Sequence, residues 1–130
     1  MFYRSSTRES DVSRHVGAWR TELRRGLVEL CVLSVLRERE AYGYQIVEQL
    51  RQQPELEFTE STVYPVLAKL HSEKLLAERQ VRSSLGPPRR YFRLTARGLS
   101  HYQEMVRQWR ALSQQVNQLI QEESADVDSH

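Results

Sequence analysis

Hydrophobic residues are most concentrated between residues 21 and 39, where Leu, Val and Cys side chains dominate the centre of the segment. This run is too long and continuous for a strand, and it predicts a helix that is buried on most of its sides. Residues 1–20 are polar and show no apolar period. They predict a flexible amino-terminal arm, with helical structure only near Val16–Trp19.

A short amphipathic helix is predicted next, over residues 41–53. Its apolar side chains Tyr42, Ile46 and Leu50 recur at intervals of four, which places them on one helical face. Pro54 follows and ends the helix, because proline cannot donate the backbone hydrogen bond that a further turn needs.

Residues 59–74 predict a third helix with a clear start. Thr59 is suited to the N-cap position, and Phe58 and Val63 have the spacing of a hydrophobic staple. The buried face is predicted to be Val63, Leu67 and Leu70. The opposite, outward face is small and polar, with Ser61, Pro65, Ala68 and Ser72 at its centre and Thr62, Tyr64 and Lys69 on its flanks.

The period then changes to alternation, which predicts a β-hairpin. Its strands are expected at 75–82 and 90–95. The connecting residues 83–88, Ser-Ser-Leu-Gly-Pro-Pro, are expected to continue neither strand, since proline lacks a backbone donor. Arg89 and Arg90 then stand at the base of the hairpin.

The last predicted helix spans residues 96–121 and is capped by Thr95. Apolar residues on it form two series with a spacing of seven, offset by three, which is the pattern of helices that pair. They are Tyr102, Met105, Trp109, Leu112, Val116 and Leu119. A helix of about 25 residues is about 37 Å long at 1.5 Å per residue. It would overhang a small domain, which favours dimerisation over packing on its own domain. Residues 122–130 are expected to form a disordered tail.

Composition limits the classes of protein that remain. The chain has 130 residues, 39% hydrophobic and 28% charged, which fits one small domain with a core. The single Cys31 excludes a disulfide scaffold, and no apolar stretch reaches the roughly 18 residues of a membrane helix. No hydrophobic signal region follows Met1, so we expect a cytoplasmic protein without a membrane partner.

The formal net charge of +2 conceals an uneven distribution along the chain. Residues 59–98 carry a balance of +5, residues 1–58 are neutral, and residues 99–130 carry −3. A basic middle between neutral and acidic ends indicates a surface for a polyanion, although a solvated face of mixed charge would give the same count.

The order of these elements predicts a winged helix-turn-helix, a mainly α fold with a small β-hairpin (α+β). We expect a DNA-binding domain over 21–95 and a dimerisation helix over 96–121. The major groove of DNA, about 12 Å wide, admits one helix with small polar outward residues, and the third helix offers that face. The hairpin arginines would then meet the flanking phosphates or the adjacent minor groove. The predicted contacts with double-stranded DNA are Thr59, Ser61, Thr62, Tyr64, Lys69, Arg89 and Arg90.

Several strings of the sequence resemble one family, the PadR-like transcriptional regulators. They are LRRGLVELCVLSVLRERE, AYGYQIVEQL, TESTVYPVLAKLHSEKLL, PRRYFRLTARG and QWRALSQQVNQLI, and they cover about residues 22–121. The runs Tyr-Gly-Tyr, Thr-Val-Tyr-Pro and Arg-Arg-Tyr-Phe-Arg-Leu-Thr are specific in this order and spacing. The chain is similar to the smaller subfamily, whose members dimerise through a single carboxy-terminal helix.

The resemblance implies further roles for individual residues. It gives one of Tyr42 and Tyr44 a phosphate contact; we favour Tyr44 for this contact and expect Tyr42 mostly to pack in the core. It also implies that Trp109 lines an apolar pore at the dimer interface, where a small planar aromatic effector stacks. The alternative is a tryptophan that only anchors the dimer. The two prolines of the hairpin depart from the glycine-rich, polar tip expected of the family.

The prediction from these patterns is a homodimeric, sequence-specific repressor of a palindromic operator, with a small aromatic ligand as a candidate effector. An interaction module of the same fold is the alternative, in which the last helix binds a partner helix and DNA is not bound. An enzyme is not expected, since no nucleophile elbow, P-loop or dinucleotide fingerprint occurs. The four histidines share no ligand spacing, so neither a metal site nor a cofactor is expected.

Overall fold

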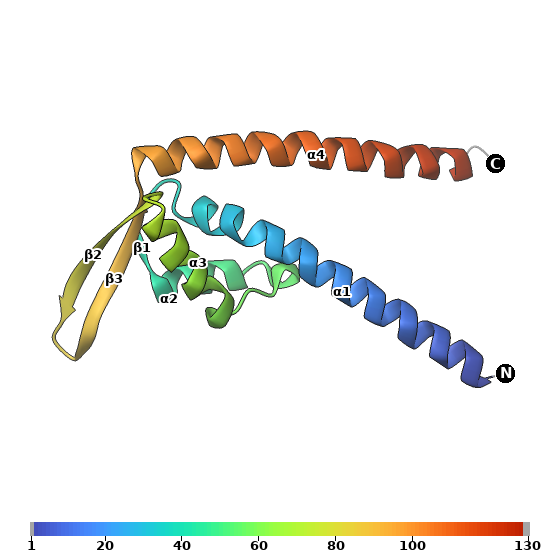
Figure 1. Ribbon diagram of the computed structural model, residues 1–130, viewed down its shortest axis with the longest axis horizontal. Coiled ribbons are helices and arrows are strands. Elements are labelled where there is room, and N and C mark those ends of the chain that lie inside the picture. Colours follow the sequence, from blue (N-terminus) through green and yellow to red (C-terminus); the bar gives the residue numbers. More distant parts are fainter. Residues whose placement is uncertain (1, 129–130) are drawn as a thin grey trace.

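A computed structural model describes the backbone of residues 2–128 and the side chains of residues 9–121. Its elements are α1 (Phe2–Val35), β1 (Ala41–Tyr42), α2 (Gly43–Arg51), a 3-10 turn η1 (Pro54–Leu56), α3 (Glu60–Ser72), β2 (Leu76–Ser83), β3 (Gly86–Leu94) and α4 (Ala96–Asp128). The long helices α1 and α4 extend to one side of the molecule and the β2–β3 hairpin projects to the other (Figure 1). The predicted fold is confirmed: a mainly helical winged helix-turn-helix with a small antiparallel sheet and a long last helix.

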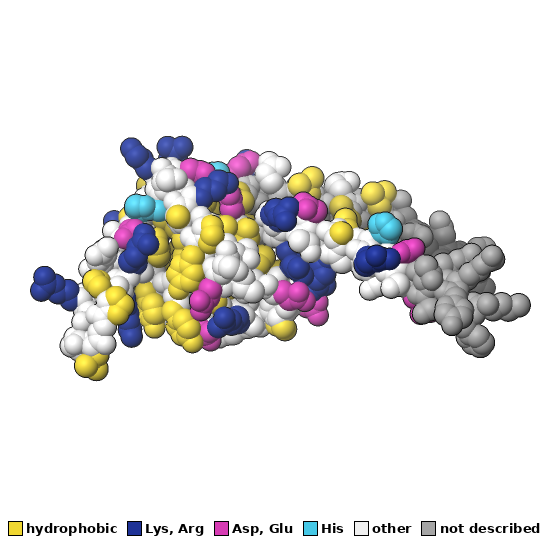
Figure 2. All heavy atoms as spheres, turned by 60° about the horizontal axis from the view of Figure 1, so that its bottom comes forward, with side chains coloured by type: hydrophobic (Ala, Val, Ile, Leu, Met, Phe, Trp, Pro, Cys, Tyr) yellow, Lys and Arg dark blue, Asp and Glu magenta, His cyan; other side chains and the backbone are white. Residues whose placement is uncertain are grey.

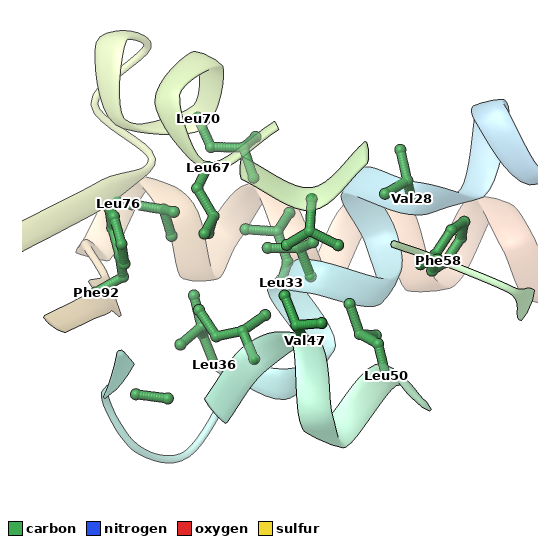
Figure 3. Close-up of a cluster of buried hydrophobic side chains, with 14 of the residues drawn as sticks. Val28, Leu33, Leu36, Val47, Leu50, Phe58, Leu67, Leu70, Leu76 and Phe92 are labelled. Atoms are coloured by element: carbon green, nitrogen blue, oxygen red, sulfur yellow. The ribbon is translucent and has the colours of Figure 1, made fainter. Parts of the chain in front are cut away.

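One hydrophobic cluster joins α1, α2, α3 and the sheet (Figure 3). The face of α3 that the sequence predicted, Val63, Leu67 and Leu70, is at most 1% exposed. It packs into the same cluster as Leu33 of α1 and Val47 of α2. Among the described side chains none of the buried ones is polar or charged, so burial of apolar surface fixes α3 against the domain.

The sheet is antiparallel, with strand order β1-β3-β2. The short β1 pairs only with the end of β3, Ala41 opposite Phe92 and Tyr42 opposite Tyr91. Strand β2 pairs along most of β3. We call the β2–β3 hairpin the wing.

The wing corrects one expectation about its connection. Strand β3 begins at Gly86 and includes both Pro87 and Pro88, so the turn is shorter than the predicted 83–88 connection. The register shifts by one residue between Val81 and Ser83, which places the prolines at an irregularity of the ladder. Proline is tolerated there because its missing donor interrupts no regular pair.

The amino-terminal segment is a second correction. The sequence predicted a flexible arm over residues 1–20, but α1 runs as a helix from Phe2. No proline interrupts it, and the pair of Asp11 and Arg14, 2.6 Å apart, supports the helix locally. Extending a helix whose second half is already packed needs no new nucleus, which favours this continuation.

The carboxy-terminal helix is also longer than expected. It continues from the predicted end at 121 to Asp128, within the segment expected as a disordered tail. No glycine or proline occurs in this stretch to stop it. The last two residues of the predicted tail, 129–130, lie outside the described residues.

The start of α4 is fixed as the sequence predicted. The Thr95 hydroxyl accepts a 2.9 Å hydrogen bond from the Gly98 amide, which caps the helix. A Cβ at Gly98 would lie 2.0 Å from the Leu75 carbonyl oxygen, so only glycine permits this close approach of α4 to the end of the helix-turn-helix. Within the described part of the chain, every helix is too short or too polar to cross a membrane.

Candidate nucleic-acid interface

The outward face of α3 carries hydroxyl groups that remain exposed. We call Thr59, Ser61, Thr62 and Tyr64 the hydroxyl face; all four are exposed, and Tyr64 is 43% exposed. The sequence placed these side chains away from the core, and the structure agrees. The helix therefore presents small polar groups to solvent on the side opposite its buried stripe.

Thr59 occupies the N-cap position of α3 with an extended backbone, although its hydroxyl bonds to no backbone amide of the helix. Its Oγ1 instead lies 2.9 Å from Oγ of Ser61 and 3.3 Å from Oγ1 of Thr62. The three hydroxyls thus form a small network on the surface. Hydroxyls donate and accept, so such a network adapts to either kind of group on a base edge or a phosphate.

Tyr64 lies directly against the first residue of α2. A Cβ at Gly43 would lie 2.6 Å from Cε1 of Tyr64, so the ring occupies the space that any larger residue would need. Burial, and then the nearby Glu60, raise the pKa of Tyr64. The Tyr64 hydroxyl, which like any tyrosine is protonated at neutral pH, can donate to an anion.

A hollow of about 270 Å³ lies between Tyr64 of this face and the wing. Its lining includes Tyr42, Tyr44, Tyr64, Pro88 and Arg89, from β1, α2, α3 and β3. Tyr44 is half exposed at the start of α2. Four of the predicted DNA contacts therefore line one depression, namely Tyr44, Tyr64, Arg89 and Arg90, whereas Thr59, Ser61, Thr62 and Lys69 are not among its lining residues.

The two wing arginines have different surroundings. The Arg89 guanidinium lies over the Tyr42 ring, 4.7 Å from its centroid. None of the ion pairs among the described residues involves Arg89. Its charge is oriented by an aromatic ring and is left available to an external anion.

Arg90 is instead held by a carboxylate within the wing. Its Nε and Nη2 donate to the two carboxylate oxygens of Glu78 at 2.9 and 2.7 Å, a bidentate pair. This pair, ahead of other causes, holds the pKa of Glu78 below its ordinary value. Figure 2 shows Lys and Arg side chains around the wing at the left end of the molecule, but neutralisation by Glu78 makes Arg90 the less available of the two.

Lys69, a predicted phosphate contact, is also paired within the chain. Its ammonium group forms an ion pair with Glu29 of α1 and lies 3.9 Å from Oε1 of Glu73. Lys69 sits in the last turn of α3, at the far end from the hydroxyl face.

The predicted dimerisation residues of α4 divide into two groups. Tyr102 and Met105 are partly buried against the chain's own core. The others are exposed by 43–68%: Trp109, Leu112, Val116 and Leu119. Trp109 and Leu112 also line an apolar groove of about 450 Å³ between α1 and α4, which we call the α1–α4 groove.

Three features of this surface escaped the sequence reasoning: the carboxylates Glu29 and Glu78, and the close contact of Gly43 with Tyr64. The glycine between two tyrosines was a usable signal, because a glycine at a helix start can mark a close approach. The carboxylates gave no local signal, since their partners are distant in sequence.

Comparisons with known proteins agree on one family. The model of the "Transcriptional regulator PadR-like family" matches residues 32–104. A PadR family regulator from Eggerthella lenta is 35% identical, with a TM-score of 0.76, and the match covers 85% of this chain and 96% of that one. A PadR-like regulator from Bacillus cereus is 33% identical, with a TM-score of 0.68, and the match covers 77% and 97%.

Two further relatives are more distant. An uncharacterized protein from Lysinibacillus sphaericus is 27% identical over 92 residues, which is 69% of this chain and 84% of that protein. Bacillus subtilis PadR, solved in complex with operator DNA, is 22% identical with a TM-score of 0.56, and the match covers 62% of this chain and 46% of that one. This last likeness concerns the fold alone. From the family match and the two closer structures, the chain belongs to the PadR-like family of transcriptional regulators, which are DNA-binding proteins and not enzymes.

Proposed function

We propose that the chain is a homodimeric repressor that recognises a palindromic operator with α3. The observation that carries this proposal is the exposed hydroxyl face of α3, whose Tyr64 lines one hollow together with Arg89, an arginine outside the ion pairs of the described residues. A helix with small polar outward groups fits the major groove, and an adjacent guanidinium is suited to the flanking phosphates. Such a protein acts in the cytoplasm.

Contacts to DNA would come from both sides of the hollow between α3 and the wing. Thr59, Ser61 and Thr62 are placed to meet base edges, while Tyr44, Tyr64 and Arg89 are placed to meet phosphates. We assign Arg90 a weaker role than the sequence suggested, because Glu78 already neutralises it. The fold is also that of Bacillus subtilis PadR, which was solved with operator DNA.

The proposed dimer rests on the distribution of exposed apolar side chains. Of the thirteen large hydrophobic residues that are exposed in the described part of the chain, ten lie on α1 and α4. Contiguous exposed apolar surface usually marks an interaction site. A second copy that covers this surface would place two α3 helices on two half-sites, as a palindrome requires.

The α1–α4 groove is the proposed site for an effector. It is lined by apolar side chains that include Leu27, Leu30, Met105 and Trp109. A planar aromatic ligand could stack on the Trp109 ring there, since stacked aromatic pairs are favourable beyond the area they bury. Fluorescence quenching of Trp109, with Trp109→Leu as the control, would measure such binding.

Selection of random duplexes by the purified protein tests the proposal. We expect enrichment of a palindrome whose half-sites lie about one helical turn, roughly 34 Å, apart. Binding to the selected duplex should weaken steeply with salt, because phosphate contacts release counterions. A protein that enriches no duplex, or whose binding is indifferent to salt, would refute it.

The alternative role as a protein-interaction module has one observation in its favour. Residues 111–121 of α4 contain no charged side chain and expose Leu112, Val116 and Leu119. This surface would accept a foreign helix as readily as a second copy. Light scattering separates the two: a monomer that enriches no duplex and captures a partner helix would favour the module.

A further inference from the structure

The start of α3 is tied to α1 by two arginines. Arg24 of α1 donates to Oε2 of Glu57 at 2.9 Å, and Arg20 lies 2.8 Å from Oε2 of Glu55 and 3.5 Å from Oε1 of Glu57. Glu57 is two residues before the N-cap of α3. The Arg24 side chain is only 22% exposed, so this contact is partly shielded from water.

Glu57 adopts a backbone conformation that favours glycine. Its φ is 53°, in the left-handed region, which is unfavourable for a residue with a Cβ. Glycine would adopt this conformation without the steric cost, but glycine would lack the carboxylate that joins Arg20 and Arg24. The backbone conformation of the turn therefore does not explain a glutamate at position 57, whereas the ion pairs with Arg20 and Arg24 do.

The far end of α3 is tied to the same helix with the opposite polarity. Lys69 in the last turn of α3 pairs with Glu29 of α1, whose side chain is 27% exposed. The hydrogen bond with Glu29 raises the pKa of Lys69 above its ordinary value, so the ammonium form persists at neutral pH. Between the two ionic contacts, apolar residues of α1 and α3 such as Val28 and Leu67 pack in one cluster (Figure 3).

The order of charges on α1 and along α3 specifies one alignment. The base Arg24 meets the acid before α3, and the acid Glu29 meets the base at its end. If α3 were reversed along α1, Arg24 would approach Lys69, and Glu29 would approach Glu57. Like charges in contact are unfavourable, so the pairs disfavour the alternatives that apolar packing alone would tolerate.

We propose that α1 fixes the orientation of the recognition helix through these two pairs, and that Lys69 and Glu57 are positioning residues. Lys69 is then an anchor of α3 and not a phosphate ligand. This inference rests on the proposed function in one respect, namely that α3 is the helix that enters DNA. It deepens that function by naming what sets the angle at which α3 is presented.

Substitution of the acidic partner separates the two roles of Lys69. If Lys69 binds phosphate, Glu29→Gln frees its charge and tightens binding to the selected duplex. If Lys69 is an anchor, Glu29→Gln and Lys69→Gln each weaken binding by about two- to fivefold, the range expected for exposed to partly shielded ion pairs. The double variant is then no weaker than either single variant, and the salt slope does not change.

A matched control removes a similar charge elsewhere on α1. Glu22 pairs locally with Arg25 at 2.8 Å, so Glu22→Gln changes the net charge equally without touching α3. We expect it to leave binding unchanged or to tighten it slightly, unlike Glu29→Gln. The exchanged pair Glu29→Lys with Lys69→Glu should bind more tightly than Lys69→Glu alone, because the contact with position 29 is remade with opposite polarity while repulsion from Glu73 is common to both proteins.

Amide hydrogen exchange gives a readout that does not require DNA. Glu57→Gln should speed exchange in the first turn of α3, and Glu29→Gln in its last turn, while α2 stays unchanged. Tighter binding in Glu29→Gln, a lower salt slope in Lys69→Gln, or unaltered exchange in both acidic variants would overturn the inference. If the wild-type protein binds no duplex, the proposed function fails, and the exchange data alone decide whether α1 holds α3.

Discussion

At the scale of single residues, the two wing arginines are neighbours in sequence with different partners. Arg89 lies on Tyr42 with its charge free, whereas Arg90 is neutralised by Glu78. Arg89→Ala should weaken binding to the selected duplex by about tenfold, the loss expected for one charge-assisted hydrogen bond. It should also reduce the salt slope by about one, because one phosphate contact is lost. Fluorescence anisotropy at several salt concentrations measures both quantities.

Arg90→Ala is the internal control for that experiment. It removes the same charge from the adjacent position, but the remaining Glu78 carboxylate loses its bidentate partner. We expect a lower melting temperature and an unchanged salt slope. The assignment of Arg89 as the wing's phosphate ligand is wrong if the slope falls only in Arg90→Ala.

The sequence could not distinguish these two arginines. Both are basic residues at the base of a predicted hairpin, and the pairing with Glu78 follows from strand register. Gln80 is opposite Arg90 and Glu78 is opposite Phe92, so Glu78 lies diagonally across the ladder from Arg90. Register depends on the irregularity near Pro87, which no local pattern reveals.

Gly43 offers a residue-scale test of the contact between α2 and α3. Alanine normally stabilises a helical position, but a Cβ here would lie 2.6 Å from Tyr64. Gly43→Ala should therefore lower the free energy of unfolding by about 1–3 kcal/mol, as overpacking does. In a Tyr64→Ala background the same change should be neutral or stabilising. Urea denaturation of the four proteins measures this coupling, and strictly additive effects would show that the contact is not formed.

At the scale of elements, the helices with a buried stripe were predictable and the exposed ends were not. Spacing alone placed the buried face of α3, and Thr95 marked the start of α4. The first half of α1 was missed, although Val12, Val16, Trp19 and Leu23 recur at four, three and four residues. These side chains are 42–64% exposed, so they bury little apolar surface that would favour the helical form.

Gly17 tests the helical state of this segment. It lies within α1, and a Cβ built on it meets no atom within 4 Å. Gly17→Ala should therefore raise helix content by circular dichroism and stabilise the protein by about 0.5–1 kcal/mol. Gly98→Ala is the contrasting case, since its Cβ would lie 2.0 Å from a backbone oxygen, and it should destabilise strongly. No change in helix content on Gly17→Ala would indicate a segment that is not helical in solution.

At the scale of the whole molecule, the domain and its long helices separate two surfaces. The wing projects from one end of the domain, and the free lengths of α1 and α4 extend from the other (Figure 1). Helix α1 contacts the elements of both surfaces: it lines the α1–α4 groove, and it carries the ion-pair partners of Glu57 and Lys69, which flank α3 and end it. A second copy or an effector that moved α1 would thus act on α3 through defined contacts.

The exposed stripe of α4 gives the last prediction. Val116 is 54% exposed, lies beyond the residues that pack on the chain's own core, and is followed three residues later by Leu119. Val116→Glu should convert a dimer to monomers in analytical ultracentrifugation without lowering the melting temperature of the monomer, because the side chain is half exposed and lies outside the core cluster. Binding to a palindrome should fall by at least tenfold, since each half-site is then bound separately and the gain from linked binding is lost.

Gln114→Glu introduces the same charge on a polar part of α4 and should leave the dimer intact. A Val116→Glu protein that remains dimeric would place the interface elsewhere, with the stripe left for a foreign helix.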